Sequence, residues 1–433
     1  MKTKQTLVCG LLVAIFALAF IACDDGSGDD KNGGKKYTVT FDSNGGSDVD
    51  AQTVADGGKA TKPADPTKAS GLTAGLWPND TPATSTYTFA EWQKDGAAYD
   101  FNTRVTADIT LTAKWTETSS GTPINLATRD EANIIAKSVA FINADTSGAA
   151  EYTLVLNENL TDVAEITHNK DNVILTITSD GTTERIISKG TVSGIVFTVG
   201  GTQVGGYAQP KKATLVIDGN ITLQGKDLWE DFNTDSLVRV MYGGTLKLKG
   251  NAKITGNMAY NYNGGGVRAM GDKPSAGVTI TMSGNAEISD NMIIGSSPEG
   301  GGVYLSNADL TMSDNASIKN NGVVGSTTLA TNNARGGGVY VYAASTFTMN
   351  GGEISGNYAI YSDGGTAQGG GVFMYGNADA EFIVASEAVK ANIKDNYVIS
   401  NDGTEKSEQV YKQNRGGSNV GVFQVGNTYA DTY

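Results

Sequence analysis

Few residues in this chain have the chemistry of a catalytic site. The only histidine, His168, lies in the polar segment 167–172, and such a histidine is typical of a solvated turn rather than of a general base. A serine or cysteine nucleophile therefore has no histidine partner elsewhere. No group of residues has the spacing of a zinc, calcium or phosphate site. We expect no metal, no cofactor and no nucleophilic catalysis.

Paired carboxylates are the other candidates, because acids distant in sequence can meet as the acid and base of a glycosidase or lyase. Three aspartates recur at what we predict to be one corner of the fold: Asp290, Asp314 and Asp395. Asparagines accompany them: Asn291, Asn321 and Asn396. Both residue types bond turn backbone, which favours a structural corner ladder over catalysis. We predict that the chain is not an enzyme.

A repeat sets the elements that position these residues. The tetrapeptide Gly-Gly-Gly-Val begins at Gly264, Gly300, Gly336 and Gly369, at intervals of 36, 36 and 33 residues. Self-similarity at a period of this size is typical of stacked, solenoid-like architectures and not of a globular catalytic core. Glycine suits the corners of such a coil, because it adopts positive φ without a steric penalty.

Each repeat continues with short alternating segments such as 303–305 and 339–341. An apolar pair two residues apart follows, for example Ile280 and Met282, and the unit closes with a segment such as Ala-Glu-Ile-Ser-Asp-Asn at 286–291. Alternation places one side chain inside and the next outside, which predicts three short strands per coil. In its periodicity and corner residues this part of the chain resembles the right-handed parallel β-helix of pectate-lyase-like proteins. The resemblance implies a fold and not a function.

One column of residues is predicted to face outward from these coils. If the valines after the triple glycines point inward, the residues that follow them point outward and stack from coil to coil. The candidate ligand-binding residues are Tyr304, Tyr340, Phe373, Arg268, Tyr342 and Tyr375. A line of exposed aromatic faces suits the apolar faces of sugar rings or a protein partner. The alternative is that the rings stack only on each other and stabilise the sheet.

The N-terminus indicates export and lipid anchoring. A basic start precedes an apolar stretch from Leu7 to Ala22, which is too short for a membrane-spanning helix and ends directly before Cys23. This segment resembles a bacterial lipobox, which implies cleavage before Cys23 and acylation of that cysteine. An ordinary secretory signal is the alternative. We expect a lipoprotein of the bacterial cell envelope, held on the outer membrane and exposed at the surface.

The chain is acidic, with 32 Lys and Arg against 46 Asp and Glu and a formal net charge of −14. Such a surface repels phosphate backbones, which excludes nucleic acid as a partner. The expected partners are the membrane, through the N-terminal lipid, and a glycan or a surface protein of a host or neighbouring cell.

Residues 37–116 contain strand-like runs separated by turn clusters such as 42–46 and 94–96. We expect a small β domain with Trp92 and Trp115 in its core. Its characteristic segments are Val-Thr-Phe-Asp-Ser-Asn-Gly-Gly at 39–46, Tyr-Asp-Phe-Asn at 99–102 and Leu-Thr-Ala-Lys-Trp at 111–115. In these segments the domain resembles the Listeria–Bacteroides repeat, or internalin-type B repeat, a β-grasp-like module of bacterial surface proteins. The resemblance implies a spacer or weak binding module without catalytic residues, and an insertion at 69–86 departs from it.

An amphipathic helix is predicted at 128–145. Thr-Arg-Asp-Glu at 128–131 has the pattern of a capping box, and Ile135, Val139 and Ile142 share one helical face. Laid over the first coil, this helix would cap an otherwise open end of the solenoid. The alternative is a helix that binds a partner.

The predicted order is a signal peptide at 1–22, the acylated Cys23 with an acidic tether to 36, the repeat domain at 37–116, a linker at 117–127, the capping helix at 128–145 and a right-handed parallel β-helix at 146–433. The fold class is all-β. The expected function is non-catalytic adhesion, ligand display or glycan binding at the cell surface. The alternative is a polysaccharide lyase or glycoside hydrolase, which would need two or three acids and an arginine or lysine converging in one groove.

Overall fold

The computed structural model describes residues 35–68, 71–73, 83–120, 134–144, 151–226, 233–272, 277–325, 333–361, 365–375, 379–400, 403–413, 422–426 and 428–429. Several predicted features lie outside these residues: the signal peptide with Cys23, the acidic tether as far as residue 34, the linker from residue 121, the capping-box segment 128–131, and residues 69–70 and 74–82 of the insertion. The described elements are strands apart from two helices, α1 (Ile134–Ala144) and α2 (Glu387–Lys390). Neither helix is long and apolar enough to cross a membrane.

An N-terminal β domain forms a six-stranded sheet in the order β2-β1-β6-β4-β3, with β5 paired to β4. Its strands are β1 (Lys36–Asp42), β2 (Gln52–Ala55), β3 (Gly71–Thr73), β4 (Ala83–Lys94), β5 (Ala97–Ala98) and β6 (Ile109–Ser120). β1 pairs antiparallel with β2 and parallel with β6, in agreement with a β-grasp-like domain. Buried and exposed residues alternate along β1, so one face of the sheet carries the core.

The two predicted core tryptophans of this domain differ in burial. Trp92 is buried, and the ring of Phe41 meets it edge-on with centroids 5.0 Å apart. Trp115 is only half-buried and packs edge-on against Phe89 at 5.8 Å. A Cβ at Gly46 would come within 2.5 Å of the Trp115 ring, so this position of the Asn-Gly-Gly turn has no room for a side chain.

The structure differs from the prediction at the insertion and at the end of the domain. Part of the insertion is β structure, because β3 pairs antiparallel with the start of β4. β6 extends to Ser120, so the first four residues of the predicted linker belong to a strand.

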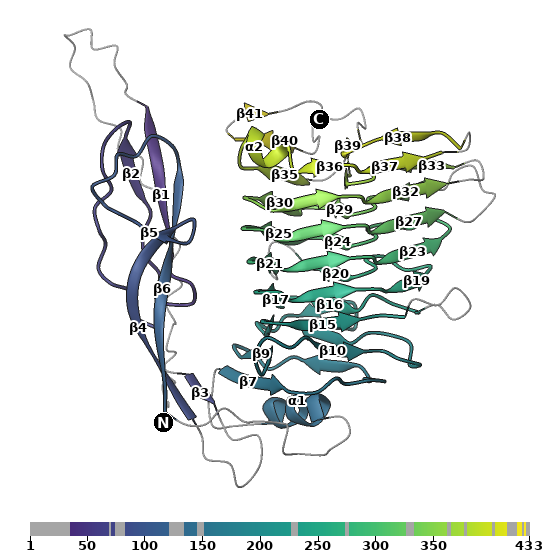
Figure 1. Ribbon diagram of the computed structural model, residues 1–433, viewed down its shortest axis with the longest axis horizontal. Coiled ribbons are helices and arrows are strands. Elements are labelled where there is room, and N and C mark those ends of the chain that lie inside the picture. Colours follow the sequence, from purple (N-terminus) through teal and green to yellow (C-terminus); the bar gives the residue numbers. More distant parts are fainter. Residues whose placement is uncertain are drawn as a thin grey trace, which may run out of the picture. The chain divides into compact units, whose positions relative to one another are not determined.

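The rest of the chain forms a parallel β-helix of four sheets, which Figure 1 shows as a stack of rungs that begins at α1. Sheet 1 holds β8 (Ile166–His168), β11 (Phe197–Gly200), β16 (Val238–Met241), β20 (Val267–Met270), β24 (Val303–Ser306), β29 (Val339–Tyr342), β34 (Val372–Met374) and β39 (Val410–Lys412). Sheet 2 holds β7 (Glu151–Leu156), β9 (Ile174–Ser179), β14 (Thr214–Ile217), β17 (Thr245–Leu248), β21 (Val278–Met282), β25 (Ala308–Met312), β30 (Thr346–Met349), β35 (Glu381–Val384), β40 (Val422–Val425) and β41 (Thr428–Tyr429).

Two further sheets complete the coils. Sheet 3 holds β10 (Arg185–Ser188), β15 (Ile221–Gln224), β18 (Lys253–Thr255), β22 (Glu287–Ser289), β26 (Ser317–Lys319), β31 (Glu353–Ser355) and β36 (Ile393–Lys394). Sheet 4 holds β19 (Met258–Tyr260), β23 (Met292–Gly295), β27 (Gly322–Gly325), β32 (Tyr358–Tyr361), β37 (Tyr397–Ile399) and β38 (Glu405–Ser407). Two small pairs lie between these strands: β12 (Thr202–Val204) with β13 (Tyr207–Gln209), and β28 (Asn333–Arg335) with β33 (Thr366–Gln368).

The repeats stack as predicted, but the regular coils have four strands rather than three. The valines of the Gly-Gly-Gly-Val motifs are in register along sheet 1: Val267, Val303, Val339 and Val372. The additional strand is that of sheet 4, which follows each corner asparagine. In β23 it reads Met-Ile-Ile-Gly. This segment does not alternate strictly between apolar and polar residues, so periodicity alone could not reveal it.

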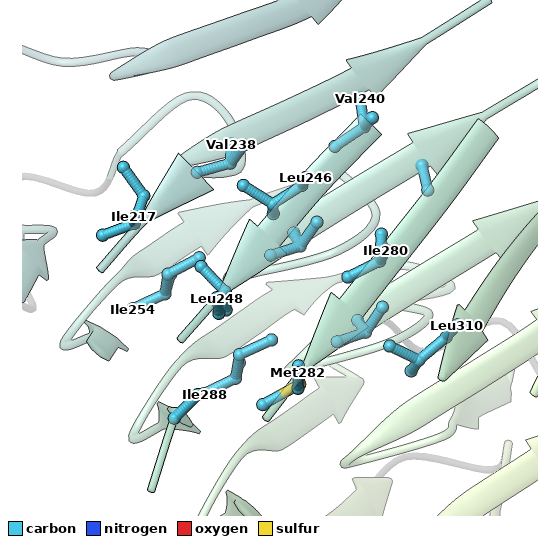
Figure 2. Packing of buried hydrophobic residues seen from close by; sticks show 14 of the residues in the cluster. Ile217, Val238, Val240, Leu246, Leu248, Ile254, Ile280, Met282, Ile288 and Leu310 are labelled. Atoms are coloured by element: carbon cyan, nitrogen blue, oxygen red, sulfur yellow. The ribbon is translucent and has the colours of Figure 1, made fainter. Parts of the chain in front are cut away.

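The interior of the coils is one continuous apolar core. Val240, Leu246 and Ile254 come from sheets 1, 2 and 3, and all three are fully buried in the same cluster. Figure 2 shows such side chains turned into the space between the strands of neighbouring sheets. Leu246 is in register with Ile280 and then Leu310, so each inward side chain lies next to its counterpart in the following coil.

Helix α1 covers the first coil. Its residues Ile135, Val139 and Ile142 are buried in the same apolar cluster as Tyr152 and Leu154 of β7. This packing is that of the expected capping helix. Near the other end of the stack, β38 pairs antiparallel with β37 and β41 pairs antiparallel with β40. These antiparallel strands end two of the parallel sheets.

The three glycines of each motif have two different roles. Gly300 has φ of 70°, a left-handed conformation that favours glycine. A Cβ at Gly301 would lie 2.4 Å from the carbonyl oxygens of Gly322 and Gly337, and one at Gly302 would lie 2.7 Å from that of Gly338. The second and third glycines are therefore required by the close approach of neighbouring coils, in addition to the turn predicted from the sequence.

Candidate functional site

The outward residues of sheet 1 form the stacked column that the repeat predicts. We call Tyr304, Tyr340, Phe373 and Tyr411 the aromatic column. The first three are in register on consecutive strands β24, β29 and β34. The rings of Tyr304 and Tyr340 have centroids 5.4 Å apart, and those of Tyr340 and Phe373 are 5.1 Å apart, with interplanar angles of 6° and 5°. Tyr411 continues the stack at 5.4 Å from Phe373.

Three rings of the aromatic column are buried, which corrects the prediction of exposed ring faces, and Tyr411 at its end is half-buried. Tyr304 is 8%, Tyr340 1% and Phe373 0% exposed. With these exposures the rings cannot present their faces to a sugar. The stack therefore stabilises the sheet, which was the alternative interpretation of the sequence.

Tyr342 and Tyr375, the other predicted binding residues beside this column, also pack against it. They are half-buried and meet each other edge-on at 4.9 Å, and their centroids lie 6.2 and 6.5 Å from that of Tyr340. Both belong to the cluster around the buried rings.

A line of polar residues runs beside the aromatic column, and we call it the polar strip. It consists of the residues that directly precede the triple glycines: Asn263, Glu299, Arg335 and Gln368. Parallel bridges join Asn263 to Glu299 and Glu299 to Arg335, and β28 and β33 join Arg335 to Gln368. The guanidinium of Arg335 lies over the Phe373 ring, with its carbon 5.3 Å from the centroid. The polar strip is therefore one reason why the rings are buried.

Glu299 is the central acid of the polar strip. Its carboxylate lies 3.6 Å from a guanidinium nitrogen of Arg335 and accepts hydrogen bonds from Asn263 (3.3 Å) and the Tyr340 hydroxyl. Burial nevertheless raises the pKa of Glu299 above its usual value, while Arg335 and the Tyr340 hydroxyl partly oppose this shift. Burial and the nearby Glu299 charge also raise the pKa of Tyr340. The tyrosine therefore acts as a hydrogen-bond donor.

A second ion pair, between the buried Asp235 and the half-buried Arg239, lies two coils earlier. Asp235 accepts hydrogen bonds from the Ser236 backbone amide (2.8 Å) and from both Nε (3.2 Å) and Nη2 of Arg239. Arg239 also donates to the Tyr262 hydroxyl at 2.5 Å. Burial raises the pKa of Asp235, and the charge of Arg239 opposes the shift. Each of these two acids thus has its own arginine.

Arg268, the remaining predicted binding residue, is more accessible than the aromatic column. It is half-buried on β20, in register with Arg239 on one side and with Tyr304 on the other. Its guanidinium carbon lies 4.6 Å from the centroid of the Tyr262 ring. The neighbouring outward positions are Met241 and Met270, which are also half-buried. We call Arg239, Met241, Tyr262, Arg268 and Met270 the arginine patch.

The predicted corner aspartates do not form a carboxylate pair. Asp290 and Asp395 lie between sheets 3 and 4, whereas Asp314 lies between sheets 2 and 3, so the prediction of one shared corner is wrong for Asp314. All three have positive φ, between 55° and 56°. In this conformation they replace the glycines found at equivalent turns, and so they act as turn residues.

The asparagines at the corner between sheets 3 and 4 form a buried ladder. The Nδ2 of Asn291 donates to Oδ1 of Asn321 at 3.0 Å, and the same bond joins Asn321 to Asn357 (3.0 Å) and Asn357 to Asn396 (2.9 Å). Gln409 accepts the last bond, from Asn396, at 2.8 Å. All four asparagines are fully buried, and the corner ladder expected from the sequence is confirmed.

His168 is buried in the first coil, which corrects the prediction of a solvated turn residue. It ends β8 in register with Val199, is 0% exposed, and its Nε2 donates to the Val173 carbonyl at 3.1 Å. Burial lowers its pKa, although backbone hydrogen bonds oppose the shift. Among the described residues no three His, Cys, Asp or Glu side chains gather where they could hold a metal ion.

The polar strip was not predicted, although the sequence carries a signal for it. The residue before each triple glycine is polar in all four repeats. This polar position recurs with the same period as the glycines. Its role, however, depends on the aromatic ring that the side chain covers in a neighbouring coil, which the period does not reveal.

No curated protein and no solved structure matches the chain. The match to a known family is confined to the N-terminal β domain. Residues 37–81 and 73–114 match the family model of the Listeria–Bacteroides repeat domain, so this domain is similar to the members of that family, as its sequence motifs predicted.

Proposed function

We propose that this chain is a lipoprotein of the bacterial cell surface that binds a ligand non-catalytically, as an adhesin or glycan-binding protein. In this proposal Cys23 carries the lipid on the outer membrane, the repeat domain is a spacer, and the β-helix presents the binding surface. The lipobox-like segment before Cys23 and the repeat domain's likeness to a surface-protein module support this assignment.

The arginine patch is the observation on which the binding role rests. Along sheet 1 the outward column changes from buried rings at Tyr304 to half-buried side chains at Arg268 and Arg239. Two methionines flank the arginines, so apolar, aromatic and charged groups lie side by side on a rigid sheet. Such a combination suits binding of a ligand with both apolar and polar groups.

A polysaccharide lyase or glycoside hydrolase is the alternative. The observation in its favour is Glu299, a half-buried acid with a raised pKa next to a tyrosine and an arginine. Against it, the Glu299 carboxylate is already bonded to Asn263, Arg335 and Tyr340, and such an arrangement fits a structural role.

A glycan array and a cell-binding assay with the purified full chain test the proposal. Met270→Glu places a negative charge beside Arg268 in the arginine patch and should abolish binding. Thr281→Glu makes the same addition at a half-buried outward position of sheet 2 in the same coil and should bind like wild type. Equal loss in both variants would point to unfolding, which circular dichroism would detect. Binding that both variants retain would exclude the arginine patch as the site, and release of shortened glycan would favour the enzyme.

A further inference from the structure

Arg268 is a cation without an anionic partner in the described part of the chain. Two acids close to the strands on either side of Arg268 are engaged elsewhere, because Asp235 pairs with Arg239 and Glu299 pairs with Arg335. The Nε of Arg268 is buried and has no hydrogen-bond acceptor. A buried donor without a partner destabilises the fold, and more so when it belongs to a charged group. Because Nε itself is inaccessible, an external oxyanion would pair with the terminal nitrogens of this half-buried side chain.

The charge around Arg268 points to the same need. Arg239 and Arg268 lie directly opposite each other on β16 and β20, and like charges in this position destabilise a sheet. Both guanidinium groups lie against the Tyr262 ring, with their carbons 5.3 and 4.6 Å from its centroid. Asp235 compensates only one of the two charges. The arginine patch thus keeps one positive charge in a chain that is acidic overall.

The surroundings of Arg268 favour an oxyanion from a ligand over a carboxylate of the chain itself. The Tyr304 ring follows in register on β24. Burial and the nearby Glu299 charge raise the pKa of Tyr304, so its hydroxyl keeps its proton and can donate it in a hydrogen bond. Guanidinium groups bind carboxylate and sulfate through paired N–H donors in a planar fork. Arg268, with Tyr262 fixing its plane, has the geometry for such a bond.

We propose that Arg268 binds the carboxylate or sulfate group of an acidic glycan, with the arginine patch as the surrounding site. This inference rests on the proposed glycan-binding function and adds to it the class of ligand. Neutral sugars lack the oxyanion that Arg268 requires, so they should bind much more weakly than their acidic counterparts.

Matched polymers test the charge requirement. Polygalacturonate should bind to the purified full chain, and the fully methyl-esterified polymer, which has the same skeleton without the charge, should bind at least about tenfold more weakly. Dextran sulfate against dextran makes the same comparison for sulfate. Arg268→Gln should remove the preference for the charged polymer, and Arg268→Lys should retain part of it. Arg185→Gln, which removes one arginine from sheet 3, is the control and should behave like wild type.

Small anions separate the inference from the function on which it rests. Thermal unfolding of wild type should shift upward with galacturonate or sulfate, and that of Arg268→Gln should not. If no polymer binds but this anion-dependent shift is present, the anion site stands and the glycan function fails. Equal binding of charged and neutral polymers, an unchanged preference in Arg268→Gln, or absence of both polymer binding and the thermal shift would overturn the inference.

Discussion

Tyr304 and Tyr340 lie parallel on adjacent coils, with ring centroids 5.4 Å apart and planes 6° apart. The spacing is close to that of neighbouring strands in a sheet, so the rings stack because their backbones pair in register. Tyr340 lies in the middle of the column, between Tyr304 and Phe373, and its hydroxyl bonds Glu299. This residue therefore joins the stack to the polar strip.

Truncation of Tyr340 should destabilise the β-helix. Tyr340→Ala leaves a ring-sized cavity between two stacked neighbours, and removal of a buried aromatic side chain costs about 3–5 kcal/mol. Tyr340→Phe retains the stack and removes only the hydrogen bond to Glu299, which should cost about 1–3 kcal/mol. Urea unfolding of both variants measures the difference. Equal midpoints for the two variants would show that the stack itself contributes little.

Glu299 should make the stability of the chain depend on pH in an unusual direction. Its pKa is raised in the folded chain from the ordinary value of 4.5, so the folded state binds the proton more tightly than the unfolded state. Its contribution to stability is complete below pH 4.5 and declines as the pH rises through the folded pKa. Relative to Glu299→Gln, wild type should lose up to about 1.4 kcal/mol per pH unit across that window. Parallel stability curves for the two proteins from pH 4 to 7 would contradict the raised pKa.

His168 should act in the opposite direction. Its pKa is lowered from 6.5 by burial, so the unfolded chain takes up a proton before the folded chain does. Stability is therefore complete above pH 6.5 and falls as the pH drops toward the folded pKa, by up to about 1.4 kcal/mol per pH unit. His168→Gln should remove this dependence. Because the chain has no other histidine, the difference between the two unfolding curves reports this side chain directly. A constant difference from pH 7 to 5 would place His168 in solvent.

The repeat determined the fold from sequence because it carries two kinds of information at once. Alternation within a segment such as 278–282 assigns each side chain to the inside or the outside, and the period aligns Ile280 with Leu310 in the next coil. Inside, outside and register together specify a parallel stack. The stacking of Tyr304 on Tyr340 follows from the same two facts.

Accessibility could not be predicted in this way. An outward residue is exposed only if nothing packs over it, and Phe373 is covered by Arg335, which lies 38 residues earlier and belongs to a different coil. The sequence shows that both residues are present, but it does not show that they lie next to each other in space. The prediction of an exposed His168 was wrong for a related reason. His168 lies before the regular repeats, where no period assigns its side chain to the interior, and its polar neighbours in the sequence suggested a solvated turn. Arg268 combines outward placement with partial exposure, as does Tyr342, whose ring packs against Tyr340.

Lipid anchoring depends on Cys23. Cys23→Ser removes the thiol that the proposed acylation requires, so the variant should leave the membrane fraction and lose labelling by a radioactive or clickable fatty acid. Replacing the other cysteine, Cys9, which lies within the proposed signal, is the matched control and should change neither result. Membrane fractionation that persists in Cys23→Ser would exclude the anchor, and loss of the labelling in the Cys9 variant would indicate a different acylation site.

The buried asparagine ladder should be far more sensitive than its exposed counterpart. Asn321 donates to the carbonyls of Ile288 and Lys319 at 2.9 and 3.0 Å and is fully buried, so Asn321→Ala leaves several buried polar groups without partners. Each such group costs about 1–3 kcal/mol, which predicts a loss of several kcal/mol. Asn285 lies in an exposed chain of asparagines, bonded to Asn251 at 2.9 Å, and Asn285→Ala should cost about 0.5 kcal/mol or less. Urea unfolding of the two variants compares the same substitution in two environments. A loss for Asn321→Ala no larger than that for Asn285→Ala would mean that the coils are held by their apolar core and backbone pairing without a contribution from the ladder.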